Sequence, residues 1–409
     1  MTILSRTLKS FPSELFLLLS LVFFLSSIGQ SAQFCAKSLS EDNKIVSITP
    51  PKGVAQIPAE EIKILRFMNF NVENFFLKLG HFDYFDGKKR TLDPKRGVKA
   101  KKDKFVKWIA RIIDVDVKPD VIAFEEIDKE PALDKFNREE VGDQYDGIVI
   151  TGNDTRGIQV GSNYNNRLPI NIEVRTNVDM TWVDKEGGSK QKVPLFSRDA
   201  PVSILRLNGY DEPLLITIVL HNKSKRSRPN DHESNRLRTA QMAGVAKIIK
   251  GLQAEFGQEA RIIVLGDMNT DVNKSSEMTP LKDIGFVESL NLVPEDRRIP
   301  VNERVTQTYH PRDGPTVMQQ LDGIFLSPSL QKYAVNAEVY RYRTEDGQIL
   351  PIPKTFKERS QQPSDHFPIF VDIDFQEIIK AILSKPKKMG AIVLWPYLPA
   401  PAQRQKLAS

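Results

Sequence analysis

The chain has 409 residues, of which 40% are hydrophobic and 27% charged, a composition typical of a globular protein. The formal net charge of +6 points only weakly to an anionic partner, because this excess is small for the length. With one cysteine, Cys35, an intramolecular disulfide is excluded.

Residues 1–32 contain the three parts of a secretory signal peptide. Arg6 and Lys9 precede an apolar segment from Leu15 to Leu25, and small residues follow it. A membrane anchor is the alternative, although this segment is short for a bilayer span. We therefore expect an exported protein, periplasmic or extracellular if its source is bacterial.

The next residues, 33–60, are polar and contain prolines, which predicts a linker. Apolar runs of strand length then recur between turn residues, and they predict strands at 62–70, 121–124, 145–150, 158–161, 170–174, 202–207, 214–220, 262–265, 324–326 and 367–373. Helical spacing predicts helices from about 105 and across about 236–254, and a short helical turn at 280–285. We expect a long basic loop at 78–104, one domain over 61–376, and a tail at 377–409.

The run from Ile262 to Leu265 is short, apolar and largely β-branched, as in a strand that is buried on both faces. Gly266 follows it, and Asp267 and Asn269 come next. Such a strand places a carboxylate and an amide at the edge of a sheet, where α/β proteins bind their ligands. An Asp/Asn turn that merely closes the strand is the alternative interpretation.

Polar side chains occupy the same position beside several other predicted strands. They are Asn71, Glu126 and His221 after a strand, and Asp322, Asp365 and His366 before one. In a mixed sheet, the carboxyl ends of some strands and the amino ends of their antiparallel neighbours lie on one edge. We therefore expect these side chains to face a single cleft together with Asp267.

The residue types in this cleft favour hydrolysis of a phosphoester. Carboxylate and amide oxygens are the ligands of Mg²⁺, with Mn²⁺ or Ca²⁺ as alternatives, and no Cys/His cluster with zinc spacing exists in the sequence. His221 and His366 add acid–base capacity near neutral pH, while Lys223 and Arg156 can neutralise phosphate charge. No G-x-S-x-G motif supports a serine hydrolase.

Seven motifs, in this order, resemble the endonuclease/exonuclease/phosphatase superfamily, which includes pancreatic-type deoxyribonucleases, abasic-site endonucleases, bacterial sphingomyelinases and inositol polyphosphate 5-phosphatases. The motifs are NFNVENFF (69–76), DVIAFEEI (120–127), RGIQV (156–160), VLHNKSK (219–225), VLGDMN (264–269), QLDGIFLS (320–327) and SDHFPIF (364–370). The resemblance covers about residues 62–375. It implies a four-layer α/β sandwich, in which two mixed β-sheets pack face to face with helices outside.

The resemblance also implies a role for each matching residue. Asn71 and Glu126 would hold the metal ion, and Asp365 would lie close to it. Asp267 would position or deprotonate the attacking water, and Asn269 would orient the phosphate. The residue before Glu126 departs from the family pattern, since Glu125 replaces the usual Gln.

The remaining motif residues would act on the phosphate itself. Asp322 would pair with His366, which would stabilise the pentavalent phosphorane. His221 would stabilise the phosphate or protonate the leaving group. The substrate-binding residues expected from the same motifs are Arg156, Lys223 and Ser224.

These observations predict an exported, divalent-metal-dependent phosphodiesterase, and a DNA endonuclease is preferred because the motifs RGIQV, HNKSK and GDMN resemble those of bacterial exported nuclease-like members. A phosphatase or phosphodiesterase acting on phospholipid, sphingomyelin or phosphoinositide is the alternative. A secreted binding protein without turnover is a third, less favoured reading. We expect nucleic acid as the partner, no stable protein partner, and a monomer.

Overall fold

The structure is a computed structural model, and it describes residues 36–39, 45–49, 51, 53–78, 80–85, 90–311 and 314–385. The predicted signal peptide at 1–32 and residues 386–409 of the predicted tail lie outside the described residues. Among the described helices, none combines the length and the apolar character that a bilayer span requires.

The larger sheet has eight strands in the described part of the chain, in the order β1-β2-β9-β12-β13-β14-β18-β15. Their bounds are β1 (Ala36–Leu39), β2 (Ile45–Thr49), β9 (Ile170–Arg175), β12 (Val202–Leu207), β13 (Pro213–His221), β14 (Ile262–Asp267), β18 (Asp322–Leu326) and β15 (Val287–Glu288). β13 and β14 run parallel at its centre, whereas β12 and β18 flank them as antiparallel neighbours. The sheet is therefore mixed.

The second sheet has six strands among the described residues, in the order β19-β20-β3-β6-β8-β7. Their bounds are β19 (Ala334–Val339), β20 (Ile369–Asp374), β3 (Ile64–Phe75), β6 (Val121–Ile127), β8 (Gln159–Asn165) and β7 (Tyr145–Ile150). Again a parallel pair, β3 with β6, lies between antiparallel neighbours. Three small two-stranded pairs join β4 (Gly80–Phe85) to β5 (Arg90–Val98), β10 (Thr181–Val183) to β11 (Lys192–Pro194), and β16 (Gln307–Tyr309) to β17 (Val317–Gln319).

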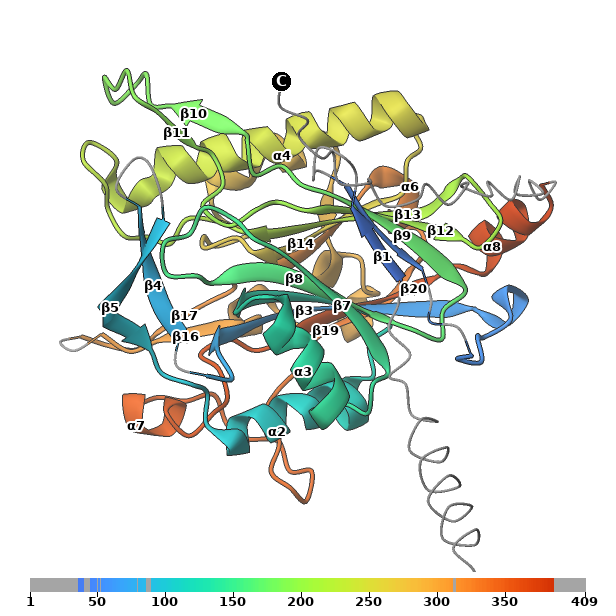
Figure 1. The fold of residues 1–409 in the computed structure, drawn as a ribbon, viewed down its shortest axis with the longest axis horizontal. Coiled ribbons are helices and arrows are strands. Elements are labelled where there is room, and N and C mark those ends of the chain that lie inside the picture. The colour runs from blue at the N-terminus through green and yellow to red at the C-terminus, as the bar shows by residue number, and fades with distance from the viewer. Residues whose placement is uncertain are drawn as a thin grey trace, which may run out of the picture.

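Helices cover the outer faces of both sheets (Figure 1). The longest, α4, lies along the larger sheet, and α2 and α3 lie along the second. Their bounds are α2 (Asp103–Arg111), α3 (Glu130–Glu140), α4 (Asn235–Phe256), α5 (Thr279–Lys282), α6 (Pro328–Gln331), α7 (Phe356–Arg359) and α8 (Gln376–Leu383). Short 3-10 turns occur at Ala59–Glu61, His232–Ser234, Ser276–Met278, Ser289–Asn291, Glu295–Arg297 and Val301–Glu303, and a π-helical turn at Ile112–Val117 extends α2. The expected four-layer α/β sandwich is thus confirmed.

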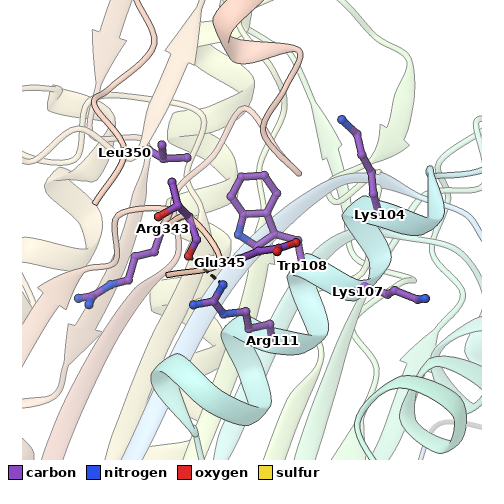
Figure 2. Close-up of a pocket in the computed structure, with 8 residues that line it drawn as sticks. Lys104, Lys107, Trp108, Arg111, Arg343, Glu345 and Leu350 are labelled. Atoms are coloured by element: carbon purple, nitrogen blue, oxygen red, sulfur yellow. Dashed lines mark hydrogen bonds between the residues drawn. The ribbon is translucent and has the colours of Figure 1, made fainter. Parts of the chain in front are cut away.

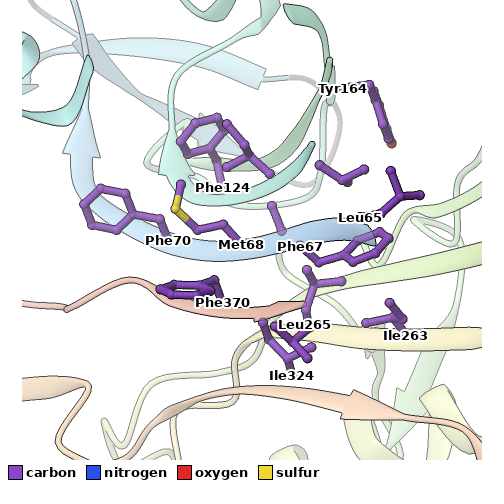
Figure 3. Close-up of a cluster of buried hydrophobic side chains, with 14 of the residues drawn as sticks. Leu65, Phe67, Met68, Phe70, Phe124, Tyr164, Ile263, Leu265, Ile324 and Phe370 are labelled. Atoms are coloured by element: carbon purple, nitrogen blue, oxygen red, sulfur yellow. The ribbon is translucent and has the colours of Figure 1, made fainter. Parts of the chain in front are cut away.

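The packing of β14 shows why residues 262–265 are apolar at every position. Ile263 and Leu265 belong to the core between the two sheets, where Figure 3 shows them facing Phe67 of β3. Ile262 and Val264 point the other way, into the core beneath α4. A strand buried on both faces has no position for a polar side chain until the sheet ends.

Three boundaries differ from the sequence-based expectation. Residues 33–60 are not only a linker, because β1 and β2 lie within them and extend the larger sheet beside β9. Residues 78–104, expected as a loop, contain the β4–β5 pair and the first two residues of α2. The predicted tail begins with α8, whose Ile378, Ile379 and Ile382 are buried in the inter-sheet core.

Candidate active site

The two parallel strand pairs end at the same edge of the sandwich. In the larger sheet, His221 at the end of β13 lies in register with Asp267 at the end of β14. Asp322 begins β18 directly opposite Asp267. In the second sheet, Asn71 pairs in register with Glu125, the residue before Glu126. The convergence predicted from the strand ends is therefore seen in the structure.

The backbone leaves the extended conformation at these strand ends. Glu73, Asn74, Glu126 and Asn269 all have left-handed φ values, between 46° and 61°. A non-glycine residue pays for this conformation in strain, and such residues collect where side chains must be aimed at a site. Here the change of direction separates the buried strands from the polar residues that follow them.

Asp267 is held by amide groups on three sides. Its Oδ1 accepts a hydrogen bond from the Asn269 backbone N–H at 2.8 Å, and its Oδ2 accepts from Asn269 Nδ2 and Asn71 Nδ2, both at 3.0 Å. Burial raises the pKa of Asp267 to about 7, against the opposing effect of the nearby His366. The carboxyl is thus fixed in place and able to exchange a proton near neutral pH.

Asp322 and His366 form a buried pair beside Asp267. His366 Nδ1 lies 2.7 Å from Asp322 Oδ2, and His366 Nε2 lies 3.9 Å from Asp267 Oδ2. Burial by itself lowers the pKa of His366, but the carboxylates of Asp322 and Asp267 outweigh it and raise that pKa well above its ordinary value. His366 is therefore a cation at neutral pH. Its backbone carbonyl accepts a hydrogen bond from Tyr342 Oη, which fixes the segment.

His221 has the opposite charge state. Its Nε2 lies 3.5 Å from Asp267 Oδ2 and 3.9 Å from Glu126 Oε1, and its buried Nδ1 has no hydrogen-bond partner among the described residues. Burial, together with the charges of Arg198 and Arg156, lowers the pKa of His221 well below its ordinary value. The cleft thus holds one cationic and one neutral imidazole, so the two histidines have separate roles.

The predicted substrate-binding residues lie around His221. Arg156 is bound to Asp154 through its backbone N–H and its guanidinium, yet 42% of its side chain stays exposed. Lys223 Nζ lies 3.3 Å from Ser224 Oγ. Burial, reinforced by Arg198 and Arg156, lowers the pKa of Lys223 to about 8. Positive side chains that lie close together lower one another's pKa values, and such a group can bind an anion.

Arg198 is a site residue that the sequence analysis did not identify. It precedes β12, only 3% of its side chain is exposed, and its Nε lies 3.2 Å from Asp154 Oδ2. Burial lowers its pKa, and the carboxylates of Asp154, Glu126 and Asp267 are among the charges that act on it. The only local signal was an Arg-Asp pair before an apolar run.

The predicted metal ligands fall in two places. Asn71 and Glu126 lie in the C-terminal parts of the neighbouring strands β3 and β6, whereas Asp365 lies beside Arg359, with Asp365 Oδ1 at 3.5 Å from Arg359 Nη2. Arg359 also pairs with Glu73, which makes Glu73 part of an ion-pair network with Asp365. Ligand atoms of Asp267, Asp322 and His366 lie within 4.8 Å of one another, but Asp322 and His366 already bind each other.

The donor set fits a hard divalent cation. Glu126 keeps Oε1 free of hydrogen bonds from described residues, while its Oε2 accepts from the Asn74 N–H at 3.0 Å. The amide oxygen of Asn71 accepts only from the Glu73 N–H, at 3.0 Å, among the described groups. Carboxylate and amide oxygens at one edge, next to a cleft that also holds cationic side chains, are the kind of incomplete shell that Mg²⁺ completes with substrate oxygens.

Glu125 lies under this cleft and is fully buried. Neither of its carboxyl oxygens has a hydrogen-bond partner among the described residues. Burial raises the pKa of Glu125 well above its ordinary value, and the carboxylates of Asp322 and Asp267 add to the shift. Burial thus favours the protonated form of Glu125, which is neutral like the glutamine expected at this position.

A model of the endonuclease/exonuclease/phosphatase family matches residues 68–366, which include each of the seven motifs up to His366. The chain belongs to this family. Endonuclease/exonuclease/phosphatase proteins are phosphoester hydrolases that act on nucleic acids or phosphorylated substrates, typically with a divalent metal ion. No curated protein sequence matches the chain.

Several solved structures are similar to the chain at low identity. They include an endonuclease/exonuclease/phosphatase family protein from Bacteroides thetaiotaomicron (15% identity, TM-score 0.44, covering 76% of this chain and 97% of that one), truncated TDP2 from Caenorhabditis elegans (14%, 0.46, 76% and 98%), and the human Nocturnin catalytic domain with bound sulfate (16%, 0.47, 76% and 95%). These similarities concern the fold alone.

Proposed function

We propose that the protein is a divalent-metal-dependent phosphodiesterase that acts as an endonuclease on DNA. The observation that carries the proposal is the setting of Asp267. Amides of Asn71 and Asn269 hold its carboxyl between a neutral and a cationic histidine. Family membership supplies the reaction class, and the side chains around Asp267 supply the steps.

In the proposed reaction, Asp267 accepts a proton from the attacking water, because its carboxyl is fixed and its pKa lies near neutrality. The cationic His366, oriented by Asp322, donates a hydrogen bond to a phosphate oxygen as negative charge grows there. The neutral His221 donates a second hydrogen bond from Nε2. When bound by Asn71 and Glu126, a divalent cation supplies Lewis-acid neutralisation of the phosphate.

The preference for DNA rests on the cations around His221. Arg156, Arg198 and Lys223 surround His221, and burial, reinforced by the neighbouring positive charges, lowers the pKa values of Arg198 and Lys223. In DNA, the scissile phosphodiester is flanked by further phosphates, so all three cationic side chains can face a negative charge at the same time. In the free protein, Asn269 Nδ2 donates to the Asn222 carbonyl at 3.1 Å and to Asp267 Oδ2 at 3.0 Å. In the proposed reaction, Asn269 orients the scissile phosphate by exchanging one of these two hydrogen bonds for a phosphate oxygen.

Incubation of the purified protein with supercoiled plasmid DNA tests this proposal. We expect nicking in Mg²⁺ and its loss both in EDTA and in the His221→Ala variant. Intact plasmid in Mg²⁺, Mn²⁺ and Ca²⁺ alike would reject the DNA substrate. Retained nicking by His221→Ala would reject the assigned cleft.

Phospholipid is a second candidate substrate, favoured by an apolar rim beside His366. Tyr309 and Met318 of the β16–β17 pair are 56% and 39% exposed, and Phe356 of α7 is 66% exposed. This pair is joined to the catalytic segment, because the Thr308 N–H donates to the Asp365 carbonyl at 3.0 Å. Release of phosphate or phosphocholine from vesicles, with DNA left intact, would favour this reading.

Export is part of the same proposal and rests on the sequence of residues 1–32. We also propose that the protein is a monomer. Determination of the N-terminus of the mature protein tests it. A mature chain that begins near residue 30 supports cleavage of a signal peptide, and an uncleaved chain recovered with membranes supports the anchor alternative. Sedimentation of the mature protein gives the oligomeric state.

A further inference from the structure

A basic cavity of about 630 Å³ lies outside the catalytic cleft, between α2 and the segment 343–350. Figure 2 shows Trp108 of α2 near the middle of this lining, with Arg343 on one side and Lys104 and Lys107 on the other. Its charged lining consists of Lys104, Lys107, Arg111, Arg343 and Glu345. The volume is in the range of pockets that enclose a small organic ligand.

The cations of this cavity are poorly neutralised. Arg111 has Asp116 at 3.7 Å and donates to the Thr344 carbonyl, but Lys107 and Arg343 have no ion pair with any described residue. Arg343 Nε is buried and has no hydrogen-bond partner among the described groups. No described carboxylate neutralises the Arg343 guanidinium, so an anionic ligand would gain a charge-assisted interaction with its other N–H groups.

Trp108 supplies an apolar surface next to these cations. Its indole packs edge-on against Tyr342, with ring centroids 5.8 Å apart and the planes at 61°. It also lines the cavity. An indole beside unpaired lysine and arginine matches a ligand that carries both a flat ring and a phosphate, because bases stack on aromatic side chains while the backbone meets the cations.

The cavity adjoins the segment that carries the catalytic pair. Lys101, just before α2, donates from Nζ to the Pro363 carbonyl at 2.6 Å, and Lys104 Nζ lies 3.5 Å from Gln361 Oε1. From the other side, Tyr342 packs on Trp108 and donates its hydroxyl hydrogen bond to the His366 carbonyl. A strand bound in the catalytic cleft therefore has this cavity as its neighbour across residues 359–366.

We propose that the cavity between α2 and residues 343–350 is a subsite for a nucleoside phosphate unit, with the base on Trp108 and its flanking phosphates on Lys107 at one side and on Arg343 at the other. The unit belongs to a single-stranded flank of the DNA substrate, so this assignment rests on the proposed function. A free nucleotide offers the same chemistry, and the experiment separates the two sources.

Binding of a fluorescein-labelled oligothymidylate to the full protein in EDTA, read by anisotropy, tests the subsite without any hydrolysis. We expect Lys107→Glu and Arg343→Gln each to weaken binding about fivefold or more at low salt. Lys247→Glu, on the exposed face of α4, makes the same charge change as Lys107→Glu and is expected to have little effect. Quenching of tryptophan fluorescence by the oligonucleotide should be reduced in Trp108→Phe.

Thymidine monophosphate in the same assay identifies the source of the ligand. Much weaker binding than that of the oligonucleotide supports a strand, whereas equal binding assigns the cavity to free nucleotides and overturns the strand assignment. Equal weakening by Lys107→Glu and Lys247→Glu, or unchanged quenching in Trp108→Phe, overturns the subsite itself. Thermal unfolding of each variant shows that the fold is intact. Failure of the proposed function would instead appear as absent hydrolysis by the wild-type protein.

Discussion

Gly266 immediately precedes Asp267, and at this residue the backbone of β14 lies very close to the backbone of β13. Its φ is +152°, and a Cβ at this position would lie 2.0 Å from the Leu220 carbonyl oxygen of β13. Only the absence of a side chain permits this contact. The strand register that sets His221 against Asp267 therefore depends on glycine here.

Gly266→Ala should accordingly lower the free energy of unfolding, by on the order of 3 kcal/mol, because β13 and β14 must separate locally. Urea denaturation measures the loss. Gly251→Ala is the matched control, since Gly251 lies inside α4 with no atom within 4 Å of its added Cβ. There alanine should stabilise the protein by about 0.5–1 kcal/mol. A neutral Gly266→Ala would contradict the close approach.

Lys223 sets an expected pH dependence. Its pKa of about 8 means that the free protein loses this charge as the pH rises through 8, whereas bound phosphate favours the protonated form. We therefore expect kcat/KM to fall above pH 8 by up to about tenfold, the worth of one charged hydrogen bond. Lys223→Arg stays protonated, so this decrease should be absent from its pH profile. If Lys223→Arg shows the same decrease at pH 8, another group causes it.

Candidate site residues could be predicted from the sequence where they directly follow or precede an apolar run that forms a strand. Asp267, His221 and Asp322 each adjoin an apolar run, and the structure places them in register. Arg198 could not be predicted in this way, because its burial depends on Asp154 from a distant segment. The charge states of the two histidines were equally out of reach, since they follow from burial and from neighbours in space.

Among the elements, α4 is fastened to the catalytic edge through a buried arginine. Arg238 Nε donates to Glu277 Oε1 at 2.9 Å, and Arg238 Nη1 donates to the Lys223 carbonyl at 3.0 Å. Glu277 in turn accepts a hydrogen bond from Thr270, the residue after Asn269. The Arg238–Glu277 pair therefore holds together the two segments, around Lys223 and around Asn269, that carry predicted phosphate-binding residues.

Arg238→Ala should cost on the order of 3 kcal/mol of unfolding free energy, because it leaves the carboxylate of Glu277 buried and unpaired. Chemical denaturation of the purified variant gives this value. Lys135→Ala, which removes an exposed pair with Glu139 in α3, should change stability by no more than about 0.5 kcal/mol. Equal effects of the two substitutions would rule out a bracing role for Arg238.

Helices and strands were predicted correctly where most of their side chains are buried. They were missed where few of their side chains are buried. The runs at 145–150 and 202–207 match β7 and β12 residue for residue. The helix α3 was not predicted, because only Leu133, Phe136 and Asn137 along it are buried. β19 is an edge strand with three of its six positions half-buried, so it lacks a clear alternating pattern. Such elements are fixed by their neighbours rather than by their own sequence.

At the scale of the whole molecule, the sandwich is closed by elements outside the expected domain boundaries. β2 pairs with β9 at one edge of the larger sheet, and α8 buries its isoleucines in the core between the sheets. The seven motifs predicted the architecture because each belongs to a central strand end. They carried no information on the peripheral elements, which complete the burial but contribute no motif.

Ile379→Ala tests whether α8 belongs to the domain. Ile379 is 1% exposed, so truncation should create a cavity and cost about 3 kcal/mol. Lys380→Ala, at an exposed neighbouring position, is expected to change stability by less than about 0.5 kcal/mol. The measurement is the midpoint of urea unfolding followed by circular dichroism. A negligible effect of Ile379→Ala would place α8 outside the cooperative unit.

Hydrolysis of bis(p-nitrophenyl) phosphate in Mg²⁺ by the wild-type protein and by Asp267→Asn tests the central claim most directly, because this small diester needs only the catalytic cleft. We predict measurable release of p-nitrophenol by the wild type, its loss in EDTA, and a kcat at least about 100-fold lower for a folded Asp267→Asn. No hydrolysis by the wild type in any divalent metal, or full activity of Asp267→Asn, would contradict the account.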